Sequence, residues 1–385
     1  VVVSATPEPE AIPVVLISLD TLRPDHLASY GYDRVTSPFI DKFAKEEAVV
    51  FEQAIAQSTW TLPSHMTMLT GLYPHEHNVT PFTKLAESVQ TLPEQLQDLG
   101  YVNGGFTGHG WWLRGNRGFA HGFTEYDNPI SAFRHIHETL NRTMFWLDVN
   151  PTSRRFLFFH TYDIHSKLVT DRYPYPYQPG DIEFRMYSKD VKENTHFVAG
   201  QKSQYRGHAL LTAYNRKEFT FTEDEHDAIN NLYDDSIRMV DQSVSELIEK
   251  MKWQGLYDNA LIIITADHGE TMNERDRYGH DTPHDEVIHV PLIVKFPKGQ
   301  FAGQRYPHQV RHIDIVPTVQ DVLGLPVDEN LQGTSLRNYL NTSFEALEYT
   351  YVTWPEHKTV RSETYKLLYH SYRDDEQKEL YNLVE

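Results

Sequence analysis

The chain has 385 residues, and 54 acidic against 35 basic side chains give a formal net charge of −19. This balance argues against a polyanion such as nucleic acid as the main partner. Hydrophobic residues make up 39% of the chain, enough for a large core, while a mean hydropathy of −0.54 and the lack of a long apolar run argue against a membrane span. The length predicts about two to three domains.

The sequence contains no cysteine, which excludes disulfides, thiolate metal sites and cysteine nucleophiles. Residues 1–13 combine small side chains with proline and glutamate, and this composition predicts a disordered lead-in. We expect the lead-in to be the remnant of a removed signal or of a trimmed chain. That expectation favours a periplasmic or secreted protein and leaves a cytoplasmic location open.

An almost continuous apolar run, Val14–Leu19, predicts a strand buried on both faces of a parallel sheet. Asp20 follows directly, at the carboxyl end of the strand, where open α/β sheets bind their ligands. A helix cap is the alternative that this segment alone leaves open. The segments 37–45 and 49–56 then predict a helix and a second strand.

Residues 58–71 have the pattern of a loop that leads into a helix. Pro63 suits the first helical position, and Gly71 suits the C-terminal stop. Thr61 would then lie at the helix N-terminus, where free backbone N–H groups and the helix dipole favour negative charge. This position suits an alkoxide nucleophile, and a plain helix cap is the alternative.

The next predicted elements are a helix at 88–99, which Gly100 ends, and a strand at 101–106. Thr107 and His109 follow that strand. They would therefore lie at the same edge of the sheet as Asp20.

The predicted strand 154–159 runs into a stretch that contains His160, Asp163 and His165. Two histidines and one aspartate within six residues at a strand end exceed what a solvated loop normally carries. We therefore expect metal or substrate contact here, with His165 preferred to His160.

Residues 171–222 lose the alternating pattern and include a tyrosine- and proline-rich run at 172–177. This composition predicts an insertion over the sheet edge, either a lid or a specificity loop. The segment 223–253 follows with apolar residues at helical spacing and predicts the clearest helix of the chain.

A further buried strand is predicted at 259–265, directly before Asp267 and His268. An adjacent aspartate and histidine at a strand end suit a divalent ion, because they combine a hard oxygen with an imidazole nitrogen. The loop after them adds His280 and His284 before a strand at 290–294.

Strands that alternate with helices predict an α/β fold with a mostly parallel central sheet flanked by helices. A helix at 314–323 completes a catalytic domain at 14–340, and short β-like runs in 341–385 predict a small antiparallel C-terminal sheet. The carboxyl edge of the central sheet would gather polar side chains whose shared placement favours a functional site: Asp20, Thr61, His109, His165, Asp267, His268 and His280.

Several stretches occur in the order typical of one known family: LISLDTLRPDHL, TLPSHMTMLTGLYP, FFHTYDIHS, GLYDNALIIITADHGE, DEVIHVPLIVKFP, RHIDIVPTVQDVLGLP with a later GTSL, and KELYNL. In these stretches the chain resembles the sulfatase family of the alkaline phosphatase superfamily, over nearly its whole length. The resemblance implies an alkaline-phosphatase-like fold and ester hydrolysis at a divalent metal ion.

The resemblance also implies roles for the residues that match. Asp20, Asp267 and His268 match metal ligands, and Thr61 stands where sulfatases carry the residue that becomes formylglycine. Thr61 is then both the nucleophile and a ligand of the metal.

Other matches imply contact with the substrate. His165 matches the histidine that touches the substrate or the leaving group. Thr107 and His109 fall where a lysine and a histidine bracket the ester oxygens. His280 stands in place of a lysine of sulfatases or of a metal-binding histidine of two-metal phosphodiesterases.

Three further residues, His65, Asp163 and His284, are expected to contact the substrate, and His65 replaces the arginine that follows Pro-Ser in sulfatases. The two-metal enzymes show Asp-x-x-x-His for their second metal. Asp163 and His165 are too close in sequence to match that pattern, which leaves a second metal open.

Thr61 cannot become formylglycine, because oxidation of a threonine gives a ketone rather than an aldehyde. We therefore expect a hydrolase that cleaves a phosphate monoester or diester, or a phosphonate ester, through a covalent Thr61 intermediate. His165, His280 or His109 would assist as a proton carrier. The expected cofactor is one divalent ion, zinc, manganese or calcium, without formylglycine.

Two alternatives remain beside the phosphorus ester. The first is a sulfuric ester hydrolase, and the second is a catalytically degenerate protein that only binds anions or glycans. The expected substrate is a small-molecule, glycan-linked or lipid-linked anionic ester.

Overall fold

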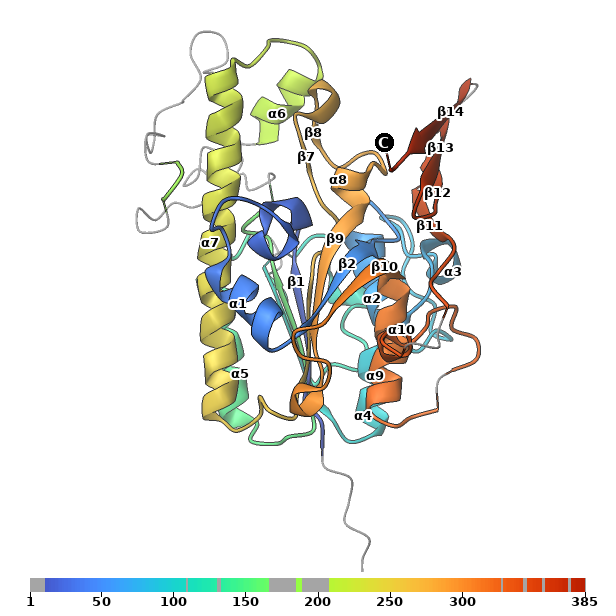
Figure 1. The fold of residues 1–385 in the computed structure, drawn as a ribbon. Helices are drawn as coiled ribbons and strands as arrows, with labels where there is room; N and C mark the ends of the chain where they lie inside the picture. Colours follow the sequence, from blue (N-terminus) through green and yellow to red (C-terminus); the bar gives the residue numbers. More distant parts are fainter. Residues whose placement is uncertain are drawn as a thin grey trace, which may run out of the picture.

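The computed structural model describes residues 11–108, 110–129, 133–165, 185–188, 208–326, 328–341, 345–354, 357–372 and 375–384. Within these ranges an eight-stranded mixed sheet forms the centre, with helices on both faces, and a separate four-stranded antiparallel sheet lies near the C-terminus (Figure 1). The predicted α/β class, mostly parallel central sheet and small C-terminal sheet are thus confirmed.

The central sheet is parallel at every neighbouring pair except those of β9, which runs antiparallel to both β2 and β6. Every residue of β1 is buried, as its unbroken apolar sequence predicts. In spatial order the strands are β10 (Arg305–Arg311), β2 (Val49–Ile55), β9 (His289–Lys295), β6 (Leu261–Thr265), β1 (Val14–Leu19), β5 (Arg155–Thr161), β3 (Val102–Thr107) and β4 (Glu125–Asp127).

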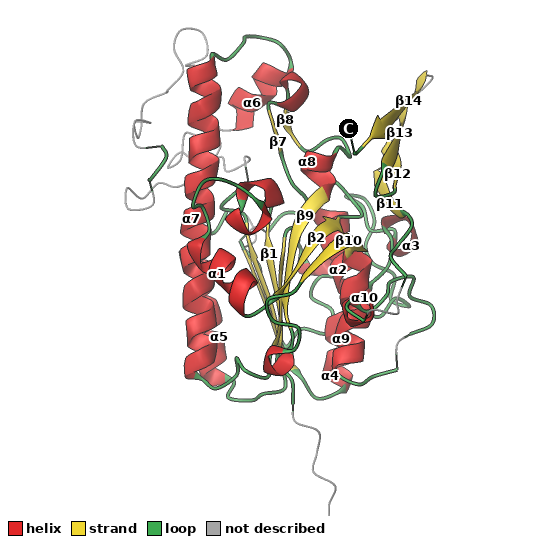
Figure 2. Ribbon diagram, in the orientation of Figure 1, coloured by secondary structure: helices red, strands yellow, loops and turns green. Residues whose placement is uncertain are grey.

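Two layers of helices cover the two faces of this sheet (Figure 2). One layer holds α1 (Pro38–Glu46), α5 (Ile136–Val149) and α7 (Glu223–Trp253). The other holds α2 (Thr61–Thr70), α4 (Leu92–Asp98), α9 (Ile315–Val322) and α10 (Leu336–Tyr339). The short helices are α3 (Pro74–His77), α6 (His208–Asn215) and α8 (Asp285–Ile288).

The helix α7 spans the residues that the apolar spacing predicts. Its first turn is closed by a capping box, in which the Thr222 side chain accepts a hydrogen bond from the Glu225 backbone N–H and the Glu225 side chain accepts one from the Thr222 backbone N–H. None of the helices in the described ranges is long and apolar enough to cross a lipid bilayer.

The strands of the C-terminal sheet lie in sequence order: β11 (Thr350–Trp354), β12 (His357–Arg361), β13 (Tyr365–Tyr372) and β14 (Asp375–Asn382). A separate two-stranded sheet pairs β7 (Thr271–Met272) with β8 (Tyr278–Gly279). Ion pairs join the C-terminal sheet to α8. Asp285 accepts from Lys366 at 2.7 Å and from Arg361 at 3.2 Å. The two cations come from the neighbouring strands β12 and β13, so one carboxylate ties two strands of the C-terminal sheet to α8.

Within the described ranges, the elements that were not predicted include α5, β4, the edge strand β10 and the short elements α3, α6, α8, α10, β7 and β8. The first half of β10 includes the exposed residues Arg305 and Pro307, and its buried second half includes the polar residues Gln309 and Arg311, so the strand lacks the apolar run of the central strands. Of the predicted insertion at 171–222, only 185–188 and the part from 208 onward fall within the described residues, where α6 lies. Residues 1–10 of the predicted lead-in lie outside them.

Candidate active site

The strand directions bring the predicted residues to one edge of the sheet. β1 is parallel to both β5 and β6, so Asp20, Tyr162 and Asp267 follow strands that end at the same edge. Because β9 is antiparallel to β6, the connection from 266 to 288 leaves this edge and returns to it. The edge therefore also receives His280.

Three side chains form the centre of the site. Asp20, Asp267 and His268 are fully buried, and each offers a ligand atom such that all three atoms lie within 4.8 Å of one another. Asp20 Oδ1 and Asp267 Oδ2 are buried and accept no hydrogen bond from the described part of the chain. Two carboxylates and one imidazole with oxygen lone pairs to spare fit a divalent metal ion.

The imidazole of His268 is oriented for this role. Its Nδ1 lies 2.9 Å from the Gly269 carbonyl oxygen and donates to it, which leaves the lone pair on Nε2. Nε2 faces Asp267 Oδ2 at 3.3 Å. The backbone thus selects the tautomer that a metal ion requires.

The electrostatics of the two carboxyl groups also favour a cation. Burial and the neighbouring charge of Asp267 raise the pKa of Asp20 well above its usual range. Two buried carboxyl groups this close do not both ionise readily unless a positive charge lies between or beside them. A divalent ion would supply that charge.

Thr61 opens α2 beside this cluster. Its Oγ1 lies 3.3 Å from Asp20 Oδ2 and 3.5 Å from His268 Nε2. Pro63 is the third helical residue rather than the predicted first, whereas Gly71 ends the helix in the left-handed region at φ 71°, as predicted. The free N–H groups of the first turn make this position favourable for negative charge.

Tyr162, which was not predicted as a site residue, touches the same hydroxyl. The Tyr162 phenol oxygen lies 2.9 Å from Thr61 Oγ1. Burial raises the pKa of Tyr162 well above 10, so the phenol stays protonated and can donate. Its position in the sequence could have indicated a site residue, because Tyr162 lies directly after β5, between His160 and His165.

Three histidines border the cluster: His160, whose Nε2 lies 3.4 Å from Asp20 Oδ2, and the predicted site residues His165 and His280. His165 Nε2 lies 3.8 Å from Asp20 Oδ1, and the His280 ring lies 4.2 Å from the His268 ring and 5.3 Å from the His165 ring. The Nδ1 of His280 donates to the Thr59 carbonyl oxygen at 2.9 Å, so its lone pair is on Nε2. The imidazoles of His165 and His280 are thus close enough to carry protons to or from a bound ester.

His65 lies beneath the nucleophile. Its Nδ1 donates to the Thr61 carbonyl oxygen at 2.8 Å and lies 3.5 Å from Asp267 Oδ2, while its Nε2 accepts from Ser18 Oγ at 2.8 Å. The ring is fully buried. These bonds fix the Thr61 backbone and hold the ring beside Asp267, and the predicted contact of His65 with substrate stays a prediction.

The structure does not bring the remaining predicted residues to the cluster. Asp163 accepts from the Ile136 backbone N–H at 2.9 Å and so holds the start of α5. Thr107 is fully buried, and its Oγ1 accepts from Asn128 at 2.9 Å. His284 lies 3.1 Å from the Tyr381 hydroxyl at the junction with the C-terminal sheet.

His109 lies outside the described residues. Its predicted contact with the ester oxygens therefore stays a prediction.

Comparison with protein-family models gives two matches. A model described as sulfatase matches residues 13–325, and a model described as N-sulphoglucosamine sulphohydrolase, C-terminal, matches residues 274–385. The first match includes Asp20, Thr61, Asp267 and His268. The second includes the C-terminal sheet.

Two curated proteins illustrate the sequence similarity. N-acetylglucosamine-6-O-sulfatase of Bacteroides thetaiotaomicron is 22% identical, and the match covers 96% of this chain and 80% of that protein. An ulvan-active sulfatase of Formosa agariphila is also 22% identical, and the match covers 82% of this chain and 53% of that protein.

Two solved structures illustrate the similarity of fold. One is described as a complex with its substrate D-glucosamine-2-N,6-O-disulfate. It has a TM-score of 0.75 and is 17% identical, and the match covers 97% of this chain and 91% of that chain. The other is a phosphonate monoester hydrolase from Silicibacter pomeroyi, with a TM-score of 0.75, 18% identity and coverage of 96% and 89%.

Proposed function

The chain belongs to the sulfatase family, and we propose that it is a divalent-metal-dependent hydrolase that cleaves a sulfuric ester of a glycan. The observation that carries the proposal is the Thr61 hydroxyl, held 3.3 Å from Asp20 beside the buried cluster of Asp20, Asp267 and His268. The names of the relatives support the sulfate ester, because the two curated examples are an N-acetylglucosamine-6-O-sulfatase and an ulvan-active sulfatase.

A divalent ion held by Asp20, Asp267 and His268 would polarise a non-bridging oxygen of the ester and offset the charge that builds up there. Thr61 Oγ attacks the sulfur in line, and its proton moves towards Asp20 Oδ2, the acceptor at 3.3 Å. Tyr162 donates a hydrogen bond at this position and helps to hold the attacking oxygen. The bond from sulfur to the alcohol oxygen breaks as the bond to Thr61 forms.

His165 and His280 are the side chains placed to protonate the departing alcohol oxygen, because an imidazole titrates near neutral pH. Water then attacks the sulfur of the Thr61 adduct, and sulfate leaves as the threonine recovers its proton. This second displacement replaces the elimination available to a formylglycine hydrate, which Thr61 cannot form.

A phosphoric or phosphonic ester is the second candidate. Thr61 favours it, because a phosphothreonine is opened by in-line water without any special residue. The structural likeness to a phosphonate monoester hydrolase supports it as well. The preference for a phosphorus ester, drawn from the sequence, stays a prediction, as do the metal's identity and a periplasmic or secreted location.

A rate panel tests the proposal. Purified protein, with its metal content measured, is assayed on an aryl sulfate, an aryl phosphate, an aryl phosphodiester, a phenylphosphonate ester and N-acetylglucosamine 6-sulfate. We expect sulfate release, and Thr61→Ala should lower it by about 10³-fold while Thr61→Ser retains part of it. Turnover of the phosphorus esters alone would favour the second candidate, and inertness on every ester with metal bound would favour a binding protein.

A further inference from the structure

A cavity of about 300 Å³ lies beside the first turn of α2, outside the metal cluster. Trp60 and Pro63 of that turn line it, together with the 74–81 segment and the strands β11 and β12. Trp60 is the residue directly before Thr61, so the cavity adjoins the nucleophile along the chain. It is large enough for one sugar ring.

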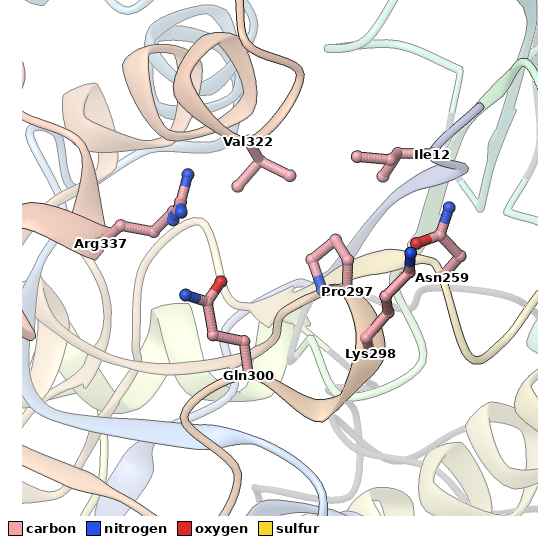
Figure 3. A pocket seen from close by; sticks show the side chains of 7 residues that line it. All are labelled: Ile12, Asn259, Pro297, Lys298, Gln300, Val322 and Arg337. Carbon is pink, nitrogen blue, oxygen red and sulfur yellow. The ribbon is translucent and has the colours of Figure 1, made fainter. Parts of the chain in front are cut away.

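A second cavity, of about 380 Å³, lies at the other end of the sheet and provides a comparison (Figure 3). Ile12 and Asn259 line it, and these residues precede β1 and β6. It therefore lies at the amino ends of the strands, away from Thr61. Lys298 also lines this cavity and serves below as a control.

The cavity beside Thr61 has one apolar wall and one polar wall. Trp60, Pro63 and Pro81 supply apolar surface, and the Trp60 ring is held edge-on against Trp112 at 4.4 Å. Across from them, β11 and β12 contribute Thr353 and Lys358. Such a pair of walls suits a sugar, which has an apolar ring face and polar edges.

The polar wall offers a ligand one cationic group. Thr353 Oγ1 is buried and has no hydrogen-bond partner among the described residues. Lys358 pairs with Thr353 in the antiparallel register, and its side chain is exposed. The Thr353 hydroxyl is covered by the protein, so the exposed Lys358 ammonium is the group of this wall that a ligand can reach.

The rim of the cavity is held in place by the protein itself. Arg117 donates to the carbonyl oxygens of Thr80 and Pro81, each at 2.8 Å. The Thr83 hydroxyl adds a bond to Thr80 Oγ1 at 2.8 Å. A ligand would therefore enter a formed cavity rather than order a loose one, which lowers the cost of binding.

A row of side chains continues from the cavity across the C-terminal sheet. Lys358 of β12 pairs with Tyr369 of β13, which in turn pairs with Lys378 of β14. The Lys378 ammonium lies 5.9 Å from the centre of the Tyr369 ring, and both lysines are exposed. The whole chain has a net charge of −19. Two exposed lysines with an aromatic ring between them therefore form a local surface that favours an anionic glycan chain.

We propose that the cavity and this row bind the anionic glycan that carries the scissile ester. One sugar ring packs on Trp60 inside the cavity, and a sulfate or carboxylate of a neighbouring sugar pairs with Lys358. The glycan then continues towards Lys378. This inference rests on the proposed function, because it assigns the substrate of the same active site.

The test compares a glycan with a small ester in the full chain. The probes are sulfated tetrasaccharides from heparin and from chondroitin sulfate, and an aryl sulfate. Lys358→Gln should raise KM for the tetrasaccharide that is turned over by about tenfold, with kcat and the aryl sulfate rate unchanged. Lys298→Gln, the same charge change at the second cavity, should leave all constants unaltered. Equal effects of both variants would overturn the proposal.

Binding separates a failure of this inference from a failure of the proposed function. The Thr61→Ala protein is titrated calorimetrically with each tetrasaccharide and with its desulfated form. We expect the sulfated form to bind, and both the Lys358→Gln change and desulfation to weaken binding by about tenfold. Lack of binding to both tetrasaccharides would refute the glycan site even if an ester is hydrolysed, whereas binding without hydrolysis would refute only the enzyme.

Discussion

The phenol oxygen of Tyr162 lies 2.9 Å from the hydroxyl oxygen of Thr61, although the two residues are 101 positions apart. Tyr162 follows β5, while Thr61 opens α2, so the contact depends on the sheet and the helix layer together. Through this contact a protonated phenol reaches the atom expected to attack the ester. It is the contact that distinguishes a positioned nucleophile from an ordinary helix cap.

Replacing Tyr162 with phenylalanine should therefore lower kcat by about 10- to 100-fold with little change in KM, because one hydrogen bond to the attacking oxygen is lost. Steady-state kinetics on the best ester of the rate panel measures this. Tyr30→Phe is the control, since Tyr30 is a partly buried tyrosine whose hydroxyl bonds only to backbone groups of β2 and β9 in the described structure. An equal loss in both variants would remove Tyr162 from the mechanism.

His65 should act on the reaction through Thr61. Replacing it with alanine removes the bond to the Thr61 carbonyl oxygen and leaves Ser18 Oγ without its partner. We expect kcat to fall about tenfold while the bound metal, measured by elemental analysis, is retained. Ser18→Ala keeps the bond to Thr61 and should cost less. A His65→Ala protein with unchanged kcat, or with no metal, would contradict this role.

Removal of the metal should lower stability as well as activity. Asp20 and Asp267 are fully buried, and a cation that binds only the folded state stabilises it by mass action. Dialysis against a chelator should therefore lower Tm by several degrees, and adding back zinc, manganese or calcium in turn should restore it. Asp267→Asn should make Tm insensitive to the chelator. A chelator-insensitive Tm in the metal-loaded native protein would argue against the site.

The junction with the C-terminal sheet should be acid-sensitive. Burial opposes ionisation of Asp285, but Lys366 and Arg361 outweigh it and lower its pKa from 3.8 to about 2. A carboxyl group with a lowered pKa stabilises the fold above the pKa of the unfolded chain, and this stability is lost as pH falls from about 4 to about 2.

Asp285→Asn should thus lower the free energy of unfolding by about 1–2 kcal/mol at pH 6, a value discounted because one third of the Asp285 side chain is exposed. The gap from the native protein should shrink as pH approaches about 3. Urea unfolding at pH 6, 4 and 3 measures it, with Asp33→Asn on an exposed loop as the control. A gap that does not change with pH would contradict the assignment.

Gly104 of β3 should not tolerate a side chain. A Cβ built there would lie 2.6 Å from the ring of Trp146, which is buried on α5. Gly104→Ala should therefore lower the free energy of unfolding by about 1–3 kcal/mol. Trp146→Phe makes room, so the double variant should be more stable than the sum of the single effects predicts. Purely additive values from urea unfolding would show that the two positions do not interact.

The central strands could be predicted from the sequence because burial on both faces demands unbroken apolar runs, as in β1 and β6. β10 could not, because its exposed positions, such as Arg305, dilute the pattern at the sheet edge. The boundaries of α4 also differ, because the helix begins at Leu92 rather than at the predicted residue 88. The weak signal of short segments at element ends accounts for such shifts.

The residues of the candidate site also fall into two groups. The position of some follows from the strands, and the position of others depends on side-chain packing. Asp20, Asp267 and His268 directly follow buried strands, and parallel strands deliver such residues to one edge whatever the details of packing. Tyr162 and His65 depend instead on which way a ring turns among tertiary neighbours. The local sequence does not determine that direction, so Tyr162 was overlooked and the bonds of His65 to Ser18 and Thr61 were not predicted.

The reversed direction of β9 has a consequence for how this enzyme scaffold can vary. Since β6 and β9 are antiparallel neighbours, the segment 266–288 that connects them begins and ends at the same edge of the central sheet. Lengthening or exchanging its middle portion leaves the pairing of the eight strands untouched. Residues such as His280 can therefore be gained, lost or moved together with this segment, while Asp267 and His268 stay at its start, directly after β6.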